Sequence, residues 1–319
     1  MTVSAAATHR HPSDKVWDSA LLAAAIGIAA ILAGIAWQLT DLSWDALARA
    51  GPWRFLSGST WDPVAGEFGA WPALYGTLVT SAIALVLAVP LALGVAIFLV
   101  EVAPARVAAV VAPLVDLLAA IPSVIFGLWG LFVLAPLMRE YVEPALQGVI
   151  PGPLFAGTPI GVGYLTAGVI LAVMVLPYIT SVAREVLAAV PGTQREAAIA
   201  LGATRFEVVR GAVVPYARSG LVGAVVLGLG RALGETMAVT MVIGNRYEVS
   251  SSLVSPGYTL AAVIANEFSE ATTRDYLSAR GGLALVLLGT TLVLNAGARL
   301  LVWRVARGRG GARVAGGAA

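Results

Sequence analysis

Two charged residues stand four positions apart inside an apolar stretch of the chain. Arg231 and Glu235 belong to the stretch at about residues 219–243, which is long enough to cross a lipid bilayer as a helix. Arg231 lies near the centre of this helix, and Glu235 shares its face and can pair with it, because residues four apart are neighbours on a helix. A charge at that depth costs at least about 2.5–3.5 kcal/mol, so we expect both side chains to face protein or water.

The guanidinium group of Arg231 is suited to binding an anion. Its planar fork can donate two parallel hydrogen bonds to one oxyanion. Glu235 would orient this fork and compete for it, which would keep an anion from binding too tightly to leave a transport pathway. A second interpretation stays open, in which the two residues form an ion pair that only holds the helices together.

The rest of the composition excludes several kinds of chemistry. No cysteine occurs, and both histidines, His9 and His11, lie in the polar N-terminal stretch, so we expect no catalytic residue, metal site or cofactor. Lys15 is the sole lysine and no glycine-rich phosphate loop precedes it, so the chain carries no P-loop ATPase of its own. The net charge of +2 is dispersed among apolar segments, which argues against nucleic acid as a partner.

The composition predicts an all-α integral membrane protein. Hydrophobic residues make up 59% of the chain and charged residues 12%, whereas soluble domains carry roughly 25% charged residues. Most lysines and arginines fall on one side of the membrane if the N-terminus is inside, so both termini are predicted to be cytoplasmic. Six apolar stretches are long enough to span, at about residues 19–40, 74–100, 108–136, 164–189, 219–243 and 282–303.

These stretches divide the chain into predicted parts with different environments. Both ends of the chain are polar or rich in small residues, and the segment after the first span contains four tryptophans, which favour the membrane interface. The predicted parts are a cytoplasmic tail at 1–18, a transmembrane anchor at 19–40, an external segment at 41–73, a core of five transmembrane helices at 74–303, and a disordered cytoplasmic tail at 304–319.

A charged loop at residues 190–218 separates the fourth and fifth spans on the predicted cytoplasmic side. Residues 194–201 form a good helix-forming run, and Gly202 ends it. A second short amphipathic helix at about 204–213 then leads to Pro215. Such a helix pair, polar on one side and apolar on the other, can insert into a groove of a partner protein.

This loop resembles the Glu-Ala-Ala loop of binding-protein-dependent ABC transporter permeases. The family pattern is Glu-Ala-Ala, three residues, glycine, nine residues and then Ile-x-Leu-Pro. The fixed positions of that pattern fall, with the same spacing, on Glu196, Ala197, Ala198, Gly202 and Pro215. Ala212 and Val214 replace the favoured Ile and Leu, and both remain apolar. The resemblance implies that this loop is the coupling helix that docks on a separate ATPase subunit, rather than an ordinary surface hairpin.

The resemblance covers about residues 76–303 and implies a fold and a set of partners. The implied fold is the type I ABC importer permease fold, without enzymatic activity of its own. The implied partners are a second permease in a heterodimer, two ATP-binding subunits, an extracytoplasmic binding protein and membrane lipid. The implied location is the bacterial plasma membrane, which the chain would cross several times.

Three further stretches, at residues 90–101, 116–130 and 228–245, resemble phosphate permeases of the PstC type. The extra first span and the external segment after it fit the same type. This resemblance implies inorganic phosphate as the solute and a phosphate-binding protein as the external partner. Permeases for sulfate, molybdate or phosphonate stay open as alternatives, as does the sister phosphate permease subunit. An ion-coupled secondary transporter and a membrane sensor without transport are more distant rivals.

Small and bending residues suggest how the spans pack. Gly230 and Gly234 form a GxxxG pair, which allows close approach of another helix, either of the second permease or within this chain. Pro122 and Ser123 could kink the third span and supply a hydroxyl to the pathway, or only accommodate a packed bend, and we favour packing. Asp116, near the predicted inner end of that span, is expected to pair with a cytoplasmic arginine.

Overall fold

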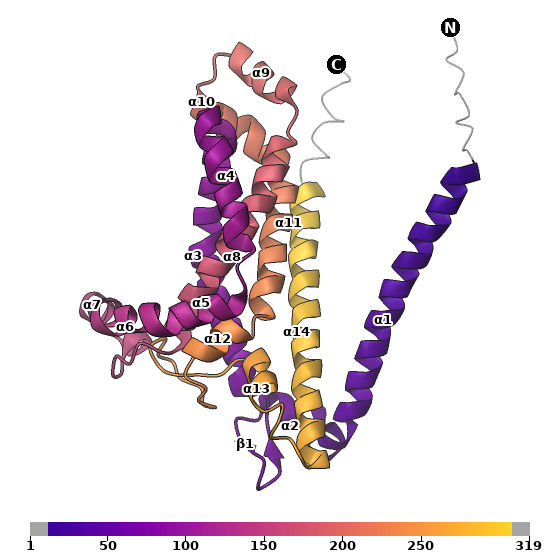
Figure 1. Cartoon of the computed structure of the whole chain (residues 1–319), viewed down its shortest axis with the longest axis vertical. Coiled ribbons are helices and arrows are strands. Elements are labelled where there is room, and N and C mark those ends of the chain that lie inside the picture. Colours follow the sequence, from indigo (N-terminus) through magenta and orange to yellow (C-terminus); the bar gives the residue numbers. More distant parts are fainter. Residues whose placement is uncertain (1–11, 308–319) are drawn as a thin grey trace, which may run out of the picture.

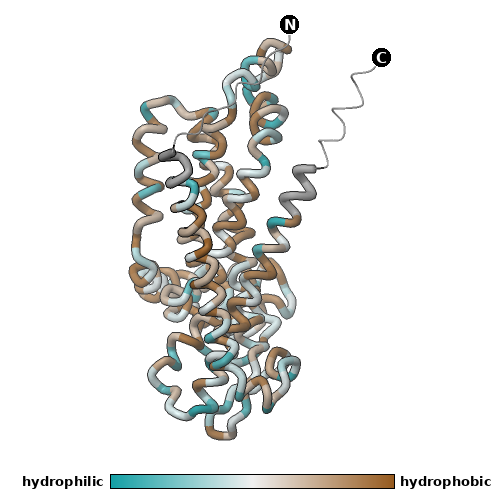
Figure 2. The backbone as a smooth tube through the Cα atoms, turned by 90° about the vertical axis from the view of Figure 1, so that its right-hand side faces the viewer, coloured by the Kyte–Doolittle hydropathy of each residue, from teal (hydrophilic) through white to brown (hydrophobic). Residues whose placement is uncertain are grey.

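The helices of the protein follow the apolar stretches of its sequence. The computed structural model describes the chain from residue 12 to residue 307, and the spans below refer to that part. Figure 2 shows hydrophobic residues along the length of the helices and hydrophilic residues mainly in the turns at their ends. Six helical runs are long and apolar enough to cross a membrane, as predicted: Trp17–Ala50, Trp71–Val102, Ser123–Val149, Tyr164–Ala188, Arg205–Leu233 and Arg274–Leu300.

The elements are almost all helical, and the short strands form a single antiparallel hairpin in which Trp61 pairs with Phe68. In chain order the α-helices and strands are α1 (Pro12–Ala50), α2 (Pro52–Ser57), β1 (Trp61–Asp62), β2 (Glu67–Phe68), α3 (Trp71–Ile97), α4 (Ala105–Ala119), α5 (Ser123–Trp129), α6 (Ala135–Leu137), α7 (Glu143–Val149), α8 (Tyr164–Ala188), α9 (Gly192–Ala200), α10 (Arg205–Val208), α11 (Val214–Leu233), α12 (Met237–Val242), α13 (Leu260–Asn266) and α14 (Arg274–Arg307). Wider π-helical turns join some of them, at Phe98–Val102, Gly130–Leu134, Met138–Val142 and Val209–Val213, and a short 3-10 turn covers Pro153–Phe155.

Helices α3 and α8 form the centre of the bundle because small residues let them approach closely. Alanines recur at every fourth position of α3, and Ala84, Ala88, Ala92 and Ala96 are fully buried. Helix α11 packs on the same α8 helix, where a methyl group added to Gly228 would lie 2.6 Å from Ile179. Small residues in a four-residue repeat are typical of helices that pack inside membranes.

One end of the bundle carries the hairpin and the other carries α9 (Figure 1). The start of α1 and the end of α14 point toward the α9 end, and the two helices meet near the hairpin end (Figure 1). There the backbone N–H of Ala46 donates to the Ser278 hydroxyl at 2.9 Å. Phe55 of α2 fills the space beside Gly282 of α14 and is buried. The hairpin end therefore has an apolar core of its own.

The third apolar stretch, predicted as one span at 108–136, is broken in the structure. Helix α4 ends at Ala119, and Pro122 begins α5 as its N-cap residue. Proline lacks an N–H and disfavours the helical conformation of the residue before it, so Pro122 stops the helix instead of only kinking it. The following run, Ser123–Val149, lies across the axis of α8 (Figure 1).

The fifth span also differs from the prediction of one helix at 219–243. A continuous helical run begins earlier, at Arg205, and ends at Leu233. Gly234 is its C-cap, and a separate helix, α12, begins at Met237. The second helix of the loop, expected to be short, is therefore the start of this span, and the helix continues past Pro215.

Several predicted boundaries fall inside helices. Helix α1 continues to Ala50, so the first part of the predicted external segment at 41–73 is helical. The predicted tails at 1–18 and 304–319 lie only partly in the described chain. Their described residues belong to α1 and α14, and the remaining residues of both tails lie outside the described part.

Candidate functional site: a charged loop and an arginine with an unpaired donor

The loop between α8 and the fifth span contains the predicted pair of helices at one end of the bundle. Helix α9 ends at Ala200, and Gly202 follows with φ +84°. This left-handed conformation is strained for residues with a Cβ atom and favours glycine. Thr204 then caps α10, because its side chain accepts a hydrogen bond from the backbone of Glu207 while the Glu207 carboxylate accepts one from the backbone of Thr204. The glycine turn and the capping box together fix the angle between the two helices.

Most of the residues of the Glu-Ala-Ala pattern are presented to the outside. Glu196 and Ala197 are exposed, Ala198 is half-buried against the bundle, and Pro215 is half-buried in α11. Large apolar side chains surround the turn without being covered, and they include Leu201, 90% exposed, and Phe206, 69% exposed. Exposed apolar groups in a contiguous patch mark an interaction surface.

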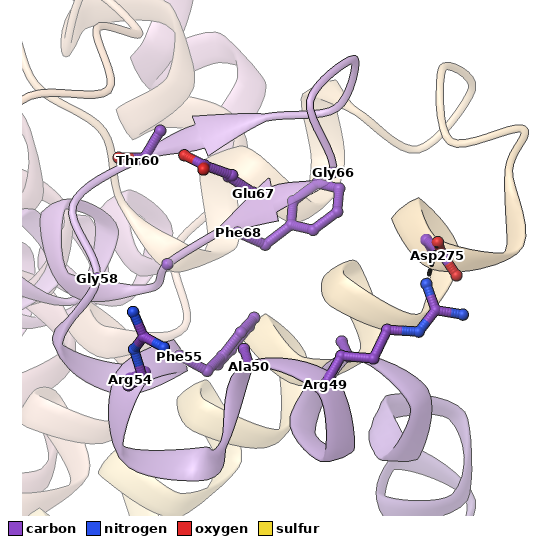
Figure 3. A pocket seen from close by; sticks show the side chains of 12 residues that line it. Arg49, Ala50, Arg54, Phe55, Gly58, Thr60, Gly66, Glu67, Phe68 and Asp275 are labelled. Atoms are coloured by element: carbon purple, nitrogen blue, oxygen red, sulfur yellow. Dashed lines mark hydrogen bonds and ion pairs between the residues drawn. The ribbon is translucent and has the colours of Figure 1, made fainter.

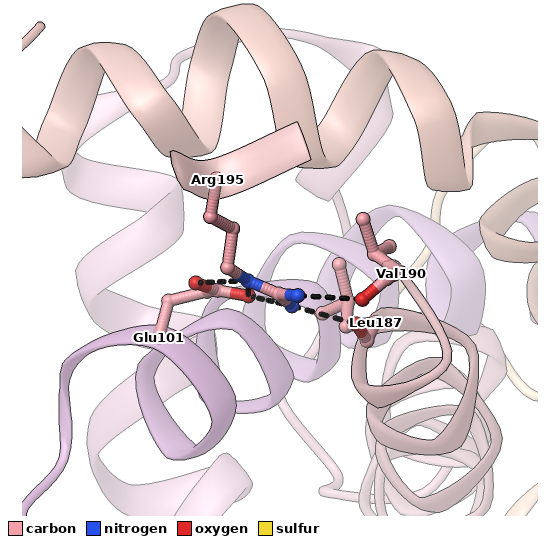
Figure 4. A network of polar contacts seen from close by, with 4 residues as sticks. All are labelled: Glu101, Leu187, Val190 and Arg195. Carbon is pink, nitrogen blue, oxygen red and sulfur yellow. Dashed lines mark hydrogen bonds and ion pairs between the residues drawn. The ribbon is translucent and has the colours of Figure 1, made fainter. Parts of the chain in front are cut away.

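Arg195, directly before Glu196, fastens α9 to the two long central helices (Figure 4). Its Nη2 lies 2.6 Å from Glu101 Oε1, at the end of the helical run that begins with α3. Its Nη1 also donates to the carbonyl of Val190, just beyond α8, at 2.6 Å. Its Nη2 donates to the carbonyl of Leu187, in the last turn of α8, at 3.0 Å. The Glu101 side chain is only 9% exposed, so this charged pair is largely shielded from solvent.

This ion pair was not predicted from the sequence. Glu101 follows an apolar stretch and Arg195 lies in a charged loop 94 residues later, so no local spacing joins them. A signal was present, because a carboxylate at the end of a span is costly to bury without a partner.

A cavity of about 410 Å³ opens beside this pair, between the end of the α3 run and α10. Its lining is mainly apolar, with Phe206, Val209 and Ile97, and charged residues Glu101, Arg205 and Arg210 at its border. Phe206 lines this cavity and is also one of the exposed apolar side chains near Gly202, so the cavity adjoins that apolar surface.

Arg231 lies in the last turn of α11, next to α8. Its guanidinium carbon is 5.6 Å from the centre of the Tyr178 ring, a cation–π distance. Its Nε is buried and has no hydrogen-bond partner within the described chain. A buried N–H donor without a hydrogen-bond partner is energetically costly, and an anion could supply the acceptor that this group lacks.

The predicted pairing of Arg231 with Glu235 is wrong for this structure. The helix ends at Leu233, so the two residues do not share a helix face. Glu235 Oε1 instead accepts a hydrogen bond from the backbone N–H of Ala238 at 3.3 Å, in the first turn of α12. Glu235 thus stabilises the break that places Arg231 at a helix end.

The glycines of the predicted GxxxG pair do not pack against another helix backbone of this chain. Gly230 faces the Asn295 side chain of α14, and a methyl group added to this glycine would lie 3.8 Å from the Asn295 amide nitrogen. Gly234 ends α11. The tightly packed glycines of α11 are Gly220 and Gly228, both against α8. Packing of Gly230 and Gly234 on a second permease stays a prediction.

Asp116 pairs with an arginine, as predicted. Its carboxylate lies 2.9 Å from Nη2 of Arg184 and accepts a hydrogen bond of 2.8 Å from the Ser181 hydroxyl. Asp116 belongs to α4 and both partners belong to α8, so this network bridges the two helices.

The hairpin end holds a charged pocket of about 390 Å³ (Figure 3). Arg49 of α1 points across it to an ion pair with Asp275 of α14, and Arg54 and Glu67 also line it. The pocket therefore carries both signs of charge, and its ion pair joins the first helix to the last.

A half-buried carboxylate holds the loops at the same end together. Glu267 Oε2 accepts hydrogen bonds from Trp61 Nε1 at 2.8 Å and from the Tyr276 hydroxyl at 2.7 Å. Burial raises the pKa of Glu267 above its ordinary value of 4.5, and the two hydrogen bonds offset part of that rise. In the part of the chain that the structure describes, no three acidic or histidine side chains gather as a metal site would require.

Comparison with known proteins agrees with this fold. The sequence model of the family described as "binding-protein-dependent transport system inner membrane component" matches residues 88–308. The chain belongs to this family, and it is a multi-pass protein of the bacterial inner membrane.

Two relatives and one solved structure show which proteins this chain is similar to. The "phosphate transport system permease protein PstC" of Mesorhizobium japonicum is 46% identical over 92% of this chain and 91% of its own length. The protein of the same description from Haemophilus influenzae is 45% identical over 88% of this chain and 90% of its own length. An inward-facing structure of the MetNI methionine ABC transporter aligns with a TM-score of 0.53 at 20% identity, over 74% of this chain and 94% of that one. This last likeness shows that the chain has an ABC permease fold.

Proposed function

We propose that this chain is a permease subunit of an ATP-driven, binding-protein-dependent importer of inorganic phosphate. The observation that carries the proposal is the similarity to PstC permeases along about nine-tenths of both chains. The unpartnered Nε of Arg231 adds a physical reason, because an oxyanion would supply the acceptor that this donor lacks. The chain contributes the pathway, and a separate subunit hydrolyses ATP.

The coupling loop is the part of the chain that receives the ATPase. Glu196, Ala197 and Ala198 lie on α9, Gly202 sets the turn, and Pro215 lies in the first turn of α11, inside the helical run that begins at Arg205. The exposed apolar side chains around this turn fit a hydrophobic groove on a partner. Since Arg195 anchors α9 to the ends of α3 and α8, a push on α9 would move both central helices.

Arg231 is the proposed contact of phosphate in the pathway, and Glu235 is the residue that positions it. Glu235 fixes the start of α12 and with it the end of α11. The ring of Tyr178 stabilises the guanidinium from one side and leaves its donors for the anion. One guanidinium without a paired carboxylate binds an anion strongly, so release must involve a movement of α11 or a second charge.

The complete importer would contain a second permease, two ATP-binding subunits and an extracytoplasmic phosphate-binding protein. The second permease could pack at Gly234, which is exposed at the end of α11, whereas Gly230 faces Asn295 of this chain. Pro122 directs α5 across the bundle, where it exposes a long apolar run to lipid or to that permease.

Purification of the tagged chain in mild detergent tests the assembly, and uptake into proteoliposomes tests the solute. We expect an ATPase and a second permease to co-purify, and uptake of phosphate to require ATP and the binding protein. Sulfate, molybdate and phosphonates should not compete at equal concentration. Uptake of one of these anions in preference to phosphate, or uptake without any ATPase, would refute the proposal.

A further inference from the structure

The cavity of about 410 Å³ beside α10 combines an apolar interior with positive charge at its border. Three charged residues border it, Glu101, Arg205 and Arg210. Glu101 is already paired, because its Oε1 lies 2.6 Å from Nη2 of Arg195. Arg205 and Arg210 are exposed, and their side chains form no ion pair or hydrogen bond within the part of the chain that the structure describes. Two positive charges can therefore meet a negative group at the mouth of an apolar cavity.

The length of the helical run that begins with α3 places this cavity at the level of lipid headgroups. The run Trp71–Val102 has 32 residues, which is about 48 Å at about 1.5 Å per residue. A bilayer with its headgroups is about 40–45 Å thick, and tryptophan is enriched at its interfaces. Trp71, 41% exposed at the hairpin end, marks one interface, so Val102 lies close to the other. Val102 lines the cavity, which is thus within reach of the lipids of the predicted cytoplasmic leaflet.

Exposed apolar side chains lead from the cavity along α3 toward the middle of the membrane. Leu87, Leu91, Phe98 and Val102 are each at least 40% exposed. Residues spaced by four and seven positions lie on one face of a helix, so these four side chains form a stripe. An acyl chain on this α3 stripe would have its headgroup at the border of the cavity, beside the two arginines.

We propose that this cavity binds an anionic phospholipid of the cytoplasmic leaflet, with its phosphate at Arg205 and Arg210 and an acyl chain along the α3 stripe. Basic pockets between membrane helices on the cytoplasmic side bind the headgroups of anionic lipids. A soluble anion would match only the arginines, and an apolar segment of a partner protein would match only the interior. A zwitterionic phospholipid would bring a positive charge close to both arginines. This lipid site does not depend on which solute the permease carries.

The lipid would hold the start of the fifth span at the membrane surface while a partner occupies α9. Arg205 is the first residue of α10, and α9 and Gly202 precede it in the chain. Figure 1 shows α9 beyond α10 at this end of the bundle. A protein on α9 and a lipid at α10 can therefore be present together, so the test uses the chain with its co-purifying subunits.

A fluorophore on Val102→Cys would report which lipid lies at the cavity. The chain has no cysteine, so this change adds the only thiol of the subunit, and the same complex without it gives the background. The complex is reconstituted in phosphatidylcholine vesicles with a small fraction of either spin-labelled phosphatidylglycerol or spin-labelled phosphatidylcholine. Phosphatidylglycerol should quench the fluorophore at a mole fraction about 25-fold lower, which is about fivefold for each arginine.

Substitution of the arginines separates a site from contact with bulk lipid. Arg205→Gln should reduce the preference for phosphatidylglycerol about fivefold, and Arg205→Gln with Arg210→Gln should abolish it. Arg299→Gln is the control, because it removes an exposed arginine of α14 that does not line the cavity, and it should leave the preference unchanged. Equal quenching by both lipids in the wild type, as expected if a partner protein fills the cavity, would overturn the inference.

A charge-preserving variant checks that the glutamine substitutions do not act through misfolding. Arg205→Lys with Arg210→Lys keeps both positive charges and should retain most of the preference for phosphatidylglycerol. A lysine variant that loses as much of the preference as the double glutamine variant would contradict the proposed role of the charges.

Inorganic phosphate distinguishes a lipid from a soluble anion as the occupant. It should reverse the quenching no more than sodium chloride of equal ionic strength does, because it has no acyl chain, and a specific reversal would contradict the lipid site. Native mass spectrometry of the purified complex gives a second readout. The wild type should retain phosphatidylglycerol that the double glutamine variant loses, and equal retention would overturn the inference.

Discussion

Arg195 Nη2 and Glu101 Oε1 lie 2.6 Å apart and connect α9, the proposed coupling helix, to the end of the helical run that begins with α3. The same guanidinium holds two carbonyls at the end of α8, so one side chain joins α9 to both central helices. Arg195 is also adjacent in sequence to Glu196 of the Glu-Ala-Ala pattern. If an ATPase moved α9, this largely shielded ion pair would transmit the movement to the central helices more directly than a flexible loop would.

Loss of the Arg195 guanidinium should uncouple ATP hydrolysis from transport. Arg195→Gln leaves the Glu101 carboxylate largely buried without a cation, which costs about 3–5 kcal/mol for a buried pair. We expect a lower thermal midpoint and a loss of most of the ATP hydrolysis that the binding protein stimulates in proteoliposomes. The matched control, Arg106→Gln, removes an exposed arginine of the neighbouring helix and should change neither. If the binding protein still stimulates ATP hydrolysis fully in Arg195→Gln, the ion pair does not transmit movement between the ATPase and the central helices.

The turn at Gly202 should depend on backbone conformation and not on the absence of a side chain. A Cβ atom at this position would meet no atom within 4 Å, while φ is +84°. Alanine in a left-handed conformation costs roughly 1–2 kcal/mol, and asparagine adopts it more readily. We therefore expect Gly202→Ala to impair coupled ATP hydrolysis and Gly202→Asn to impair it less.

Gly202→Asp, which adds charge at the docking surface, should impair coupling at least as strongly as Gly202→Ala. Gly211→Ala is the control, because this glycine is helical and a methyl group there meets open space. Equal activity of Gly202→Ala and the wild type would contradict a functional role for the turn.

The orientation of the chain follows from its arginines and can be measured by accessibility. Thr60, beside the hairpin, and Ser251 are exposed at one end, and Thr204 is exposed at the other. In intact cells, cysteines from Thr60→Cys and Ser251→Cys should react with a membrane-impermeant reagent, and a cysteine from Thr204→Cys should not. The reverse labelling pattern would place α9, and any ATPase, on the wrong side of the membrane.

Glu267 should make the hairpin end less stable as pH rises. Its pKa is raised above 4.5 by burial, so the folded protein binds a proton more tightly than the unfolded chain does. The stabilisation by the protonated form is complete below about the unfolded value and is lost as pH rises through the higher folded value. The thermal midpoint of the wild type should fall across this window, and Glu267→Gln should remove that part of the pH dependence. An identical pH profile in the variant would contradict this assignment.

Much of the fold could be predicted from the sequence because lipid imposes simple rules. Long apolar stretches predicted the number of helical runs that are long and apolar enough to span, and the Glu-Ala-Ala spacing located the α9–Gly202–α10 turn. Helix ends inside the membrane were harder to predict. Apolarity continues through Pro122 and Gly234, so hydropathy alone did not show that α4 and α11 stop there.

The contacts between distant charges could not be predicted from spacing. Arg231 and Glu235 were expected to share a helix face, and the break after Leu233 separated them. Arg195 and Glu101 were not paired in advance because only packing of α9 on the bundle brings them together. Asp116 was expected to pair with a cytoplasmic arginine, and the structure identifies that arginine as Arg184, which the sequence did not single out.

Phosphate uptake by the reconstituted transporter with Arg231 replaced is the most direct test of the proposed pathway. Arg231→Gln should assemble with the ATPase and insert into the membrane as the wild type does, yet lose ATP-driven uptake of radiolabelled phosphate. Arg231→Lys should recover little, because lysine keeps the charge but loses the planar fork. Glu235→Gln should assemble and slow uptake by loosening the start of α12. Wild-type rates of phosphate uptake in Arg231→Gln would contradict the proposed pathway, since the anion would then pass without its charge partner.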